Sequence, residues 1–304
     1  MQAVWELVLR RLLERDVDPI RLFIKPEPHK ESKLVEGRYR LISSVSVIDQ
    51  IIDTMLFGPM NEMMVKNVVY LPSKFGWSPY VGGWRLMPRG GQLALDKSSW
   101  DWTVCGWCCE MVLEIRKRLC KNLTQEWLEL AEWRYKELFG QPWFITSGGQ
   151  LLRQREPGVM KSGCVNTISD NSIMQVILHV RVCSEIGVEP GPILSMGDDT
   201  LQEPVENQEE YERVLARYCK VKETHRRVEF AGHIFSGMRV EPAYWSKHCF
   251  QMLHADPAIV PDLGISYSLL YHRSNKKRLV QSILAEMGAE LPPDEMLDVV
   301  FDGW

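Results

Sequence analysis

A short apolar run that ends in two neighbouring acids constrains this chain more than any other feature. In "PILSMGDDTLQEPV" (192–205), the apolar side chains favour a buried strand and Gly197 permits a turn. Asp198 and Asp199 follow at the tip of the run. Two adjacent carboxylates repel each other, and a bound divalent cation removes that repulsion. The stretch therefore predicts either a plain polar turn or part of a metal site.

Length and composition allow one large domain or two to three lobes around a cleft. The chain has 304 residues, of which 45% are hydrophobic and 25% charged, as in an ordinary soluble globular protein. Its N-terminal stretch is amphipathic and unlike a secretory signal, and no apolar run is long enough to cross a bilayer. The net charge of −4 means that any contact with nucleic acid depends on local basic patches. Eight irregularly spaced cysteines favour a reducing compartment over a disulfide framework.

Helical and strand patterns alternate without strict order, which predicts a mixed α/β or α+β fold. Asn122, followed by Gln125, is the predicted N-cap of one helix. Two hairpins are expected, over 143–154 and 227–240, and strands are expected at 21–25 and from residue 92 up to a polar turn that ends at 103. Helices are predicted over 3–15, 46–64, 104–121, 122–139, 167–185 and 206–220, and the chain after residue 240 is predicted to be mainly helical.

Asp96 is the strongest partner for the two acids, because it ends the strand-like run "QLALD" (92–96). Strand-end carboxylates that meet could hold two Mg²⁺ ions, an arrangement suited to phosphoryl transfer. Asp101 follows closely enough to face the same cleft, where it could accept a hydrogen bond without binding metal. Either acid could instead cap a helix.

The loop "EPGVMKSGCVNTISDNS" (156–172) is rich in small and hydroxyl residues and precedes a predicted helix. Gly158 and Gly163 allow unusual backbone geometry or close approach to a ligand. Three neutral hydrogen-bonding side chains suit sugar hydroxyls and phosphates, namely Ser162, Thr167 and Asn171. The alternative is an ordinary helix N-terminus.

The polar segment 25–40 is basic, and its two prolines exclude a continuous helix. Near a metal cleft such a segment would suit a triphosphate, and arginine offers forked contacts that lysine cannot make. Alone, it would indicate a solvated surface. Its basic residues, with one just before it, are Arg21, Lys25, Lys30, Lys33, Arg38 and Arg40.

Two further patterns carry little weight. "CGWC" (105–108) is spelled like a thioredoxin-type redox motif, but it lies in a predicted helix whose apolar face needs these positions. The scattered His233, His248, Cys249 and His254 lack the spacing of a zinc finger.

Taken together, these segments resemble the viral RNA-dependent RNA polymerases, most closely those of sobemoviruses and sobemo-like viruses. Six stretches between residues 21 and 240 carry the resemblance in the family's order: "FIKPEPHK", "RYRLISSVSVIDQ", "DKSSWDW", "PGVMKSGCVNTISDNS", "GDD" and "EFAGHIFSG". The resemblance implies a right-hand α+β fold whose antiparallel palm sheet is flanked by helices. The implied parts are partial fingers (1–91), palm (92–121 and 158–240), a fingers–palm connection (122–157) and a short helical thumb (241–304).

The resemblance also implies roles for individual residues. Asp96, Asp198 and Asp199 would bind Mg²⁺, which Mn²⁺ can replace. Asp101 would sense the incoming ribose, and the motif that holds Ser162, Thr167 and Asn171 would help to recognise its 2′-hydroxyl. The nucleotide channel would be lined by Lys25, Lys30, Arg38 and Arg40.

Further roles follow from the same resemblance. Lys222, with Lys220 as the alternative, would be the general acid that protonates pyrophosphate. Phe235 and Ser236 would lie in a hairpin that grips the primer. With only 24 residues before Lys25, we expect a fragment that lacks most of the N-terminal fingers.

The implied function is replication and transcription of a positive-strand RNA genome from ribonucleoside triphosphates. Expected partners are template and product RNA and other viral replication proteins, which would hold the chain at membrane-associated complexes in the host cytoplasm. A reverse transcriptase-like enzyme is one alternative, although an aromatic residue usually stands there in place of Asp101. An inactive RNA-binding relic is another, although it would be expected to have lost Asp96 or Asp198.

Overall fold

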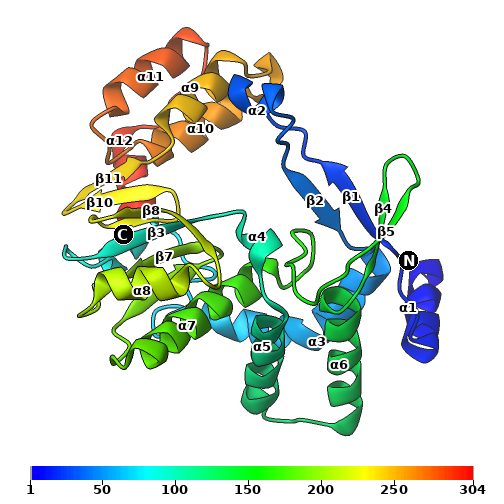
Figure 1. The fold of residues 1–304 in the computed structure, drawn as a ribbon. Coiled ribbons are helices and arrows are strands. Elements are labelled where there is room, and N and C mark those ends of the chain that lie inside the picture. The colour runs from blue at the N-terminus through cyan, green and yellow to red at the C-terminus, as the bar shows by residue number, and fades with distance from the viewer. Residues whose placement is uncertain (1, 304) are drawn as a thin grey trace.

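Three β-sheets and the helices around them make up the computed structural model, which describes residues 2–303 (Figure 1). This mixed α+β architecture confirms the predicted fold class. In the view of Figure 1 the N-terminal helix lies at the right, and the C-terminal helices lie at the upper left.

The first sheet joins segments that lie far apart in the sequence. Its strand order is β2-β1-β4-β5, in which β1 pairs antiparallel with β2 and parallel with β4. The β4–β5 pair is the hairpin predicted at 143–154. The strands are β1 (Ile20–Ile24), β2 (Leu41–Ser44), β4 (Trp143–Thr146) and β5 (Leu151–Arg153).

The second sheet is fully antiparallel and has the order β6-β7-β3-β8. Its strands are β3 (Leu93–Ser98), β6 (Ile193–Met196), β7 (Asp199–Gln202) and β8 (Lys220–His225). Helices α7 (Thr167–Ile186) and α8 (Gln208–Leu215) pack together beside it, with α7 against β6. Leu93 and Leu95 belong to the large apolar core that this sheet shares with the neighbouring helices.

The third sheet connects the second sheet to the C-terminal helices (Figure 1). The hairpin predicted at 227–240 is confirmed and has a third strand, so that the sheet contains β9 (Glu229–Phe230), β10 (His233–Ser236) and β11 (Arg239–Pro242). The C-terminal part is helical, as predicted, and has an apolar core of its own. It consists of α9 (Trp245–Leu253), η2 (Pro257–Ile259), α10 (Val260–Leu270), α11 (Lys277–Glu286) and α12 (Asp294–Asp302).

The remaining helices surround the first two sheets. The predicted helices at 3–15, 46–64 and 167–185 are confirmed to within two residues at each end. A short helix follows the two prolines of the basic segment. These elements are α1 (Gln2–Glu14), α2 (Glu31–Val35), α3 (Val47–Lys66), η1 (Gly83–Leu86), α4 (Trp100–Thr103), α5 (Gly106–Leu119) and α6 (Gln125–Phe139).

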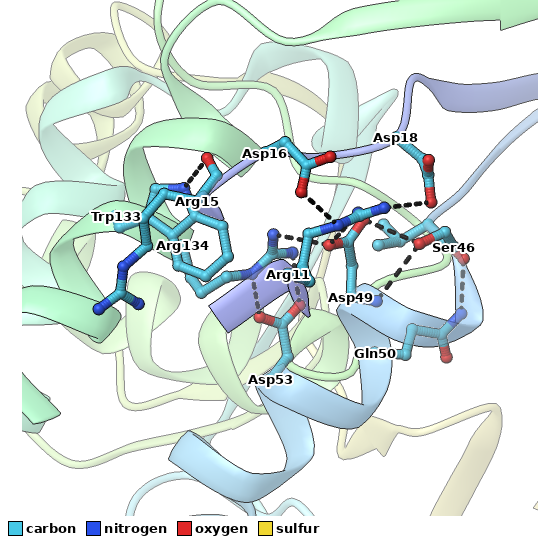
Figure 2. A network of polar contacts seen from close by, with 11 residues as sticks. Arg11, Arg15, Asp16, Asp18, Ser46, Asp49, Gln50, Asp53, Trp133 and Arg134 are labelled. Atoms are coloured by element: carbon cyan, nitrogen blue, oxygen red, sulfur yellow. Dashed lines mark hydrogen bonds and ion pairs between the residues drawn. The ribbon is translucent and has the colours of Figure 1, made fainter. Parts of the chain in front are cut away.

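A buried ionic network ties α1, α3 and α6 together (Figure 2). Arg11 Nη1 of α1 lies 2.9 Å from Asp49 Oδ1 of α3, and Arg134 Nε of α6 lies 2.6 Å from Asp53 Oδ1. Arg11 also binds Asp16, just after its own helix. Arg11, Arg134 and the two α3 carboxylates are almost fully buried, so each charge depends on its partners.

Two local predictions were wrong. The helix predicted from Asn122 begins at Gln125, because the hydroxyl of Thr124 accepts a hydrogen bond from the backbone N–H of Trp127 at 3.1 Å. Thr124 therefore takes the capping position. The helix predicted over 206–220 ends at Leu215, and the chain enters β8 at Lys220 because pairing with β3 satisfies its backbone there.

The region around Asp96 also differs from expectation. Asp96 lies inside β3 and does not end the strand, since the pairing with β8 continues to Ser98. The helix predicted from residue 104 is preceded by the short α4, which contains Asp101. Asp96 is therefore not a helix cap, and Asp101 lies within a helix and not before one.

Candidate active site

The second sheet brings the predicted acids together on neighbouring strands. Asp96 lies in β3, Asp199 begins β7, and Asp198 occupies the turn before it. Leu95 is paired with Thr200, so continuing that antiparallel register by one residue puts Asp96 opposite Asp199. Residues directly opposite each other share one face of a sheet. The two carboxylates therefore lie on the same side.

The turn itself has the geometry predicted from its glycine. Gly197 has φ of +63°, a left-handed conformation that side chains disfavour. Met196 and Asp199 are paired on either side of it, so the hairpin is tight. Asp198 is exposed at its tip, whereas Asp199 is partly buried.

Burial and repulsion perturb one acid of this cluster, Asp199. Burial is the largest cause, and together with the charges of Asp198 and Asp96 it raises the pKa of Asp199 to about 6. The charge of Lys97 has the opposite effect and lowers the pKa of Asp199. Its buried Nζ donates a hydrogen bond to Thr200 Oγ1 at 3.0 Å, and burial lowers its pKa. Lys97 was not among the residues predicted for the site, although its place directly after Asp96 was a usable signal.

Lys222 is bonded directly to one of the three acids. Its Nζ lies 2.6 Å from Asp96 Oδ2, and this hydrogen bond is the main cause that raises the pKa of Lys222. In β8 the register shifts, since Glu223 is paired with Asp96 and Val221 with Lys97. Lys222 is therefore the extra residue of a β-bulge, a feature that redirects side chains. Lys220, the alternative, is paired with Ser98 further along the strand.

Asp101 and Asn171 form a direct pair beside the acids. Asn171 Nδ2 donates a hydrogen bond to Asp101 Oδ1 at 3.0 Å. Burial is the largest influence on the pKa of Asp101; with repulsion from Asp198 it outweighs the Asn171 bond and the charge of Arg40, and the net shift is upward. Asp101 is thus close enough to interact electrostatically with both Asp198 of the acidic turn and Arg40 of the basic segment.

The glycine-bounded loop is fastened to its neighbours by backbone hydrogen bonds. The N–H of Met160 donates to the carbonyl of Asp101 at 2.8 Å, and that of Gly163 donates to Ser43 at 3.0 Å. A Cβ at Gly158 would lie 2.2 Å from the Val104 carbonyl oxygen. The loop backbone at position 158 therefore lies too close to the backbone at Val104 for any residue but glycine, as the sequence predicted.

The two hydroxyls of this loop are already engaged. Ser162 Oγ accepts a hydrogen bond from the backbone N–H of Ser43 at 3.1 Å, which links the loop to β2. Thr167 Oγ1 donates to the carbonyls of Lys161 and Cys164, both at 2.8 Å. Both side chains therefore shape the loop, and Thr167 closes it onto the start of α7.

Ser172 links α7 to the acidic turn, a role that the sequence analysis missed. Its Oγ accepts a hydrogen bond from the backbone N–H of Gly197 at 2.9 Å. Its carbonyl accepts one from Ser195 Oγ at 2.8 Å. Ser172 directly follows Asn171, so one stretch of helix positions both the Asp101–Asn171 pair and the acidic turn.

The basic segment 25–40 folds back on itself between β1 and β2. Lys25 Nζ lies 3.0 Å from one oxygen of Glu27, and Arg40 Nη1 lies 3.1 Å from the other. Arg38 pairs with Glu36. Lys30 immediately precedes α2 and is exposed. Of this segment, Arg40 alone is among the groups that shift the pKa of Asp101.

The two residues of the predicted primer grip lie in different environments. Phe235 is buried in β10 and contacts the ring of Trp77 within an apolar core that also contains Phe230. Its neighbour Ser236 is exposed at the end of the same strand. Phe235 therefore stabilises the hairpin from inside, and Ser236 is the one of the pair available at the surface.

A cavity of about 220 Å³ lies on the acidic side of the second sheet. Its lining includes Asp96, Asp199 and Lys222 from that sheet, and Gly232 and Tyr244 from the third sheet and the segment after it. The cavity therefore lies between the acids and the open end of the β10–β11 hairpin, the end opposite Ser236.

The acids are chemically suited to a hard divalent cation. Carboxylate oxygens are preferred Mg²⁺ ligands, and the pKa of Asp199 is raised first by burial and then by repulsion from Asp198 and Asp96, which a cation would relieve. In residues 2–303, however, no group of three or more His, Cys, Asp or Glu side chains is already arranged to hold a metal ion. None of the helices described within residues 2–303 is long and apolar enough to span a membrane.

Comparison with known proteins bears directly on this site. A family model described as viral RNA-dependent RNA polymerase matches residues 16–211, which include the acidic turn and the pair of Asp101 and Asn171. The chain is 32% identical over 295 residues to Protein P1-P2 of Potato leafroll virus, with 88% of this chain and 27% of that protein covered. It is 30% identical over 280 residues to the Replicase polyprotein P2AB of Southern cowpea mosaic virus, with 84% and 28% covered.

A third relative gives the same result. The chain is 33% identical over 266 residues to the Replicase polyprotein P2AB of Cocksfoot mottle virus, with 82% of this chain and 27% of that protein covered. The chain thus spans about a quarter of the length of these curated relatives. The family match covers well over half of the chain, and the resemblance drawn from six short segments is confirmed. Because the family model matches most of the chain and its relatives are at least 30% identical over more than two thirds of it, the chain belongs to the family of viral RNA-dependent RNA polymerases.

Proposed function

We propose that this chain is the polymerase part of a longer viral replicase and copies RNA from ribonucleoside triphosphates. The observation that carries the proposal is the meeting of Asp96 and Asp199 across two strands, with Asp198 in the adjoining turn. The bonded pair of Asp101 and Asn171 lies beside them and suits recognition of a ribose hydroxyl. The replicase names of two relatives agree with this function.

Asp96, Asp198 and Asp199 would hold two Mg²⁺ ions, for which Mn²⁺ can substitute. Bound there, the ions would supply Lewis-acid stabilisation of the transferring phosphoryl group. The chain's own part is to keep the carboxylates on one face of the sheet. It also supplies the proton for the departing pyrophosphate, for which Lys222 is well placed because it lines the same cavity as Asp96 and Asp199.

Other side chains would bind and orient the substrates. Asp101 and Asn171 select the sugar, with Ser162 and Thr167 shaping the loop beneath it. Ser236, exposed at the end of β10 next to the buried Phe235, would contact the primer. The triphosphate channel would use four cations of the basic segment, namely the partly buried Lys25 and the exposed Lys30, Arg38 and Arg40.

The proposed arrangement is a right hand. The second and third sheets with α7 and α8 would form the palm, β1, β2 and the basic segment would belong to the fingers, and α9 to α12 would form the thumb. Residues 122–157 connect fingers and palm. Template and product RNA, nucleotides and other viral replication proteins are the proposed partners. The proposed location is a membrane-associated replication complex in the host cytoplasm, reached through those partners.

Replacing one acid tests the proposal. Asp198→Asn should reduce RNA primer extension by at least about a hundredfold, the scale expected when charge stabilisation of a transition state is removed. RNA affinity should remain near that of the parent, because phosphate contacts come mainly from basic side chains. Glu206→Gln, an exposed acid beyond the same sheet, is the matched control and should leave extension unchanged.

The same assay separates the alternative functions. Parent and variants are compared with ribonucleotides and with deoxynucleotides on an RNA template. Preference for deoxynucleotides would indicate a reverse transcriptase, and RNA binding without synthesis by the parent would indicate a relic. Residual activity of Asp198→Asn within tenfold of the parent contradicts the assignment of the acids.

A further inference from the structure

Trp100 is bonded to the side chain that contacts Asp101. Its indole Nε1 donates a hydrogen bond to Asn171 Oδ1 at 2.9 Å, and Asn171 Nδ2 donates to Asp101 Oδ1 at 3.0 Å. Trp100 is 3% exposed and Asn171 is 4% exposed, so water cannot replace either bond easily. The three side chains form a chain of hydrogen bonds from the core to the edge of the site.

The chemistry of the three groups permits one direction only. An indole N–H donates and cannot accept, whereas a carboxylate accepts and cannot donate. The amide of Asn171 must therefore turn its oxygen to Trp100 and its NH₂ group to Asp101. Either neighbour favours this orientation, and the two together exclude the flipped one.

The backbones on both sides are held firmly, so the side-chain torsion of Asn171 is the adjustable part. Trp100 belongs to the main apolar core. On α7, the preceding residue Asp170 is fully buried and accepts hydrogen bonds from Arg116 Nη2 at 2.6 Å and from the Tyr135 hydroxyl at 2.8 Å. The start of the helix is thus anchored immediately beside Asn171.

We propose that Trp100 is a positioning residue for nucleotide recognition: it fixes the Asn171 amide and, through it, the Asp101 carboxylate. The inference rests on the proposed function and names a determinant of its sugar selectivity. Asn171 engages one oxygen of Asp101, which leaves the other oxygen available to accept from a sugar hydroxyl. Without the indole N–H, Asn171 Oδ1 loses its buried donor and the amide can rotate away from Asp101.

The first experiment measures nucleotide binding by the 304-residue chain, using calorimetry with ATP and dATP in the presence of Mg²⁺. Trp100→Phe keeps an aromatic ring but lacks the donor. It should lower the preference for ATP over dATP by roughly 3- to 10-fold, the effect of about one hydrogen bond. The loss should arise from weaker ATP binding. Trp102→Phe, at an exposed position of the same short helix, should retain the parent's preference.

A double-mutant cycle separates positioning from general damage. In an Asn171→Ala background, Trp100→Phe should change the preference no further, because the group it positions is absent. Equal preference in the parent and Trp100→Phe overturns the inference, as does a parent that binds ATP and dATP equally. Neither result decides the proposed function, which the RNA synthesis assay tests separately.

A spectroscopic measurement covers the case in which a variant folds poorly. In the NMR spectrum of the chain with ¹⁵N-labelled tryptophan, the indole resonance of Trp100 is assigned as the one that disappears in the spectrum of Trp100→Phe. In the parent it should exchange slowly with solvent, and Asn171→Ala should shift it while leaving the Trp102 resonance in place. An indole resonance of Trp100 that does not respond to Asn171→Ala contradicts the hydrogen bond and the inference with it.

Discussion

Lys161 is a fully buried lysine in the loop that carries Ser162. Its Nζ donates to the carbonyl of Val159 at 2.6 Å, to that of Gly158 at 3.1 Å and to Gln154 Oε1 at 2.8 Å. Burial, the largest cause, lowers its pKa to about 7. One ammonium group thus ties together the turn of the loop, at the expense of burying a charge.

The stability of the chain should depend on pH through this lysine. Below about pH 7 the amine is protonated in both folded and unfolded chains, and the full cost of burying it is present. Between 7 and the ordinary value of 10.5, the folded chain releases a proton that the unfolded chain keeps. Stability should therefore rise with pH in this window, by at most about 3 kcal/mol from pH 7 to pH 9.

Urea unfolding of the parent and Lys161→Met over that range measures this effect. Their difference in unfolding free energy should change with pH, since methionine cannot titrate. Lys66→Met, an exposed lysine with a surface ion pair, should leave the parent's pH profile unchanged. Parallel profiles for parent and Lys161→Met would show that the amine stays charged in the fold.

Arg40 is the cation of the basic segment that acts on Asp101. Arg40→Ala should raise the KM for nucleotide several-fold and weaken RNA binding less. Arg40→Lys should recover little, because an ammonium cannot reproduce a guanidinium fork. Steady-state extension over a range of nucleotide concentrations checks this, with the exposed Arg118→Ala as control. Full recovery by lysine would indicate a simple charge effect.

At the scale of elements, α7 connects two parts of the site. Asn171 faces Asp101, and the next residue, Ser172, bonds Gly197 of the acidic turn. A shift of this helix would therefore move both groups together. The hydroxyl that bonds the turn itself can be removed without changing the backbone.

Ser172→Ala should destabilise the chain by about 1–3 kcal/mol, because it leaves the Gly197 N–H without its partner in a partly buried turn. Extension should slow as well, since the turn carries Asp198. Urea unfolding and primer extension measure the two effects. Ser184→Ala, at an exposed position near the end of the same helix, is the control. Unchanged stability and rate would mean that strand pairing alone holds the turn.

At the scale of the whole molecule, charged side chains join the N-terminal helix to the rest. In Figure 2, Arg11 and Arg134 enclose Asp49 from two helices, while Asp16 and Asp18 bind Arg11 from the chain that leads into β1. Val8, on the same helix, packs against Ile48 and Ile52 of α3. The position of α1 thus depends on both ionic and apolar contacts.

Arg11→Met should destabilise the chain by about 3–5 kcal/mol, the range for breaking a buried ion pair and leaving its partner uncompensated. Hydrogen exchange should show the first loss of protection in α1 and the start of α3. The neighbouring Arg10→Met removes an exposed surface pair and should cost less than about 1 kcal/mol. Equal effects of the two substitutions would contradict a structural role for the network.

Much of this molecule follows from local sequence. Apolar periodicity predicted α1, α3 and α7, and turn-forming residues predicted the hairpins at 143–154 and 227–240. Gly197 and the two acids after it predicted a tight turn, and Gly158 predicted a close approach. These features depend on residues only a few positions apart, whose preferences the chain carries with it in any fold.

Other features depend on pairs that are distant in sequence. Residues 220–225, part of which the sequence predicted as helix, became a strand because they pair with β3. The same pairing brought Lys222 to Asp96, and the packing of α4 on α7 brought Trp100 to Asn171. The sequence by itself determined which helices, turns and acids this protein has. Only the tertiary structure decided which side chains meet, because strand register and buried hydrogen bonds are set by contacts between segments that local patterns do not relate.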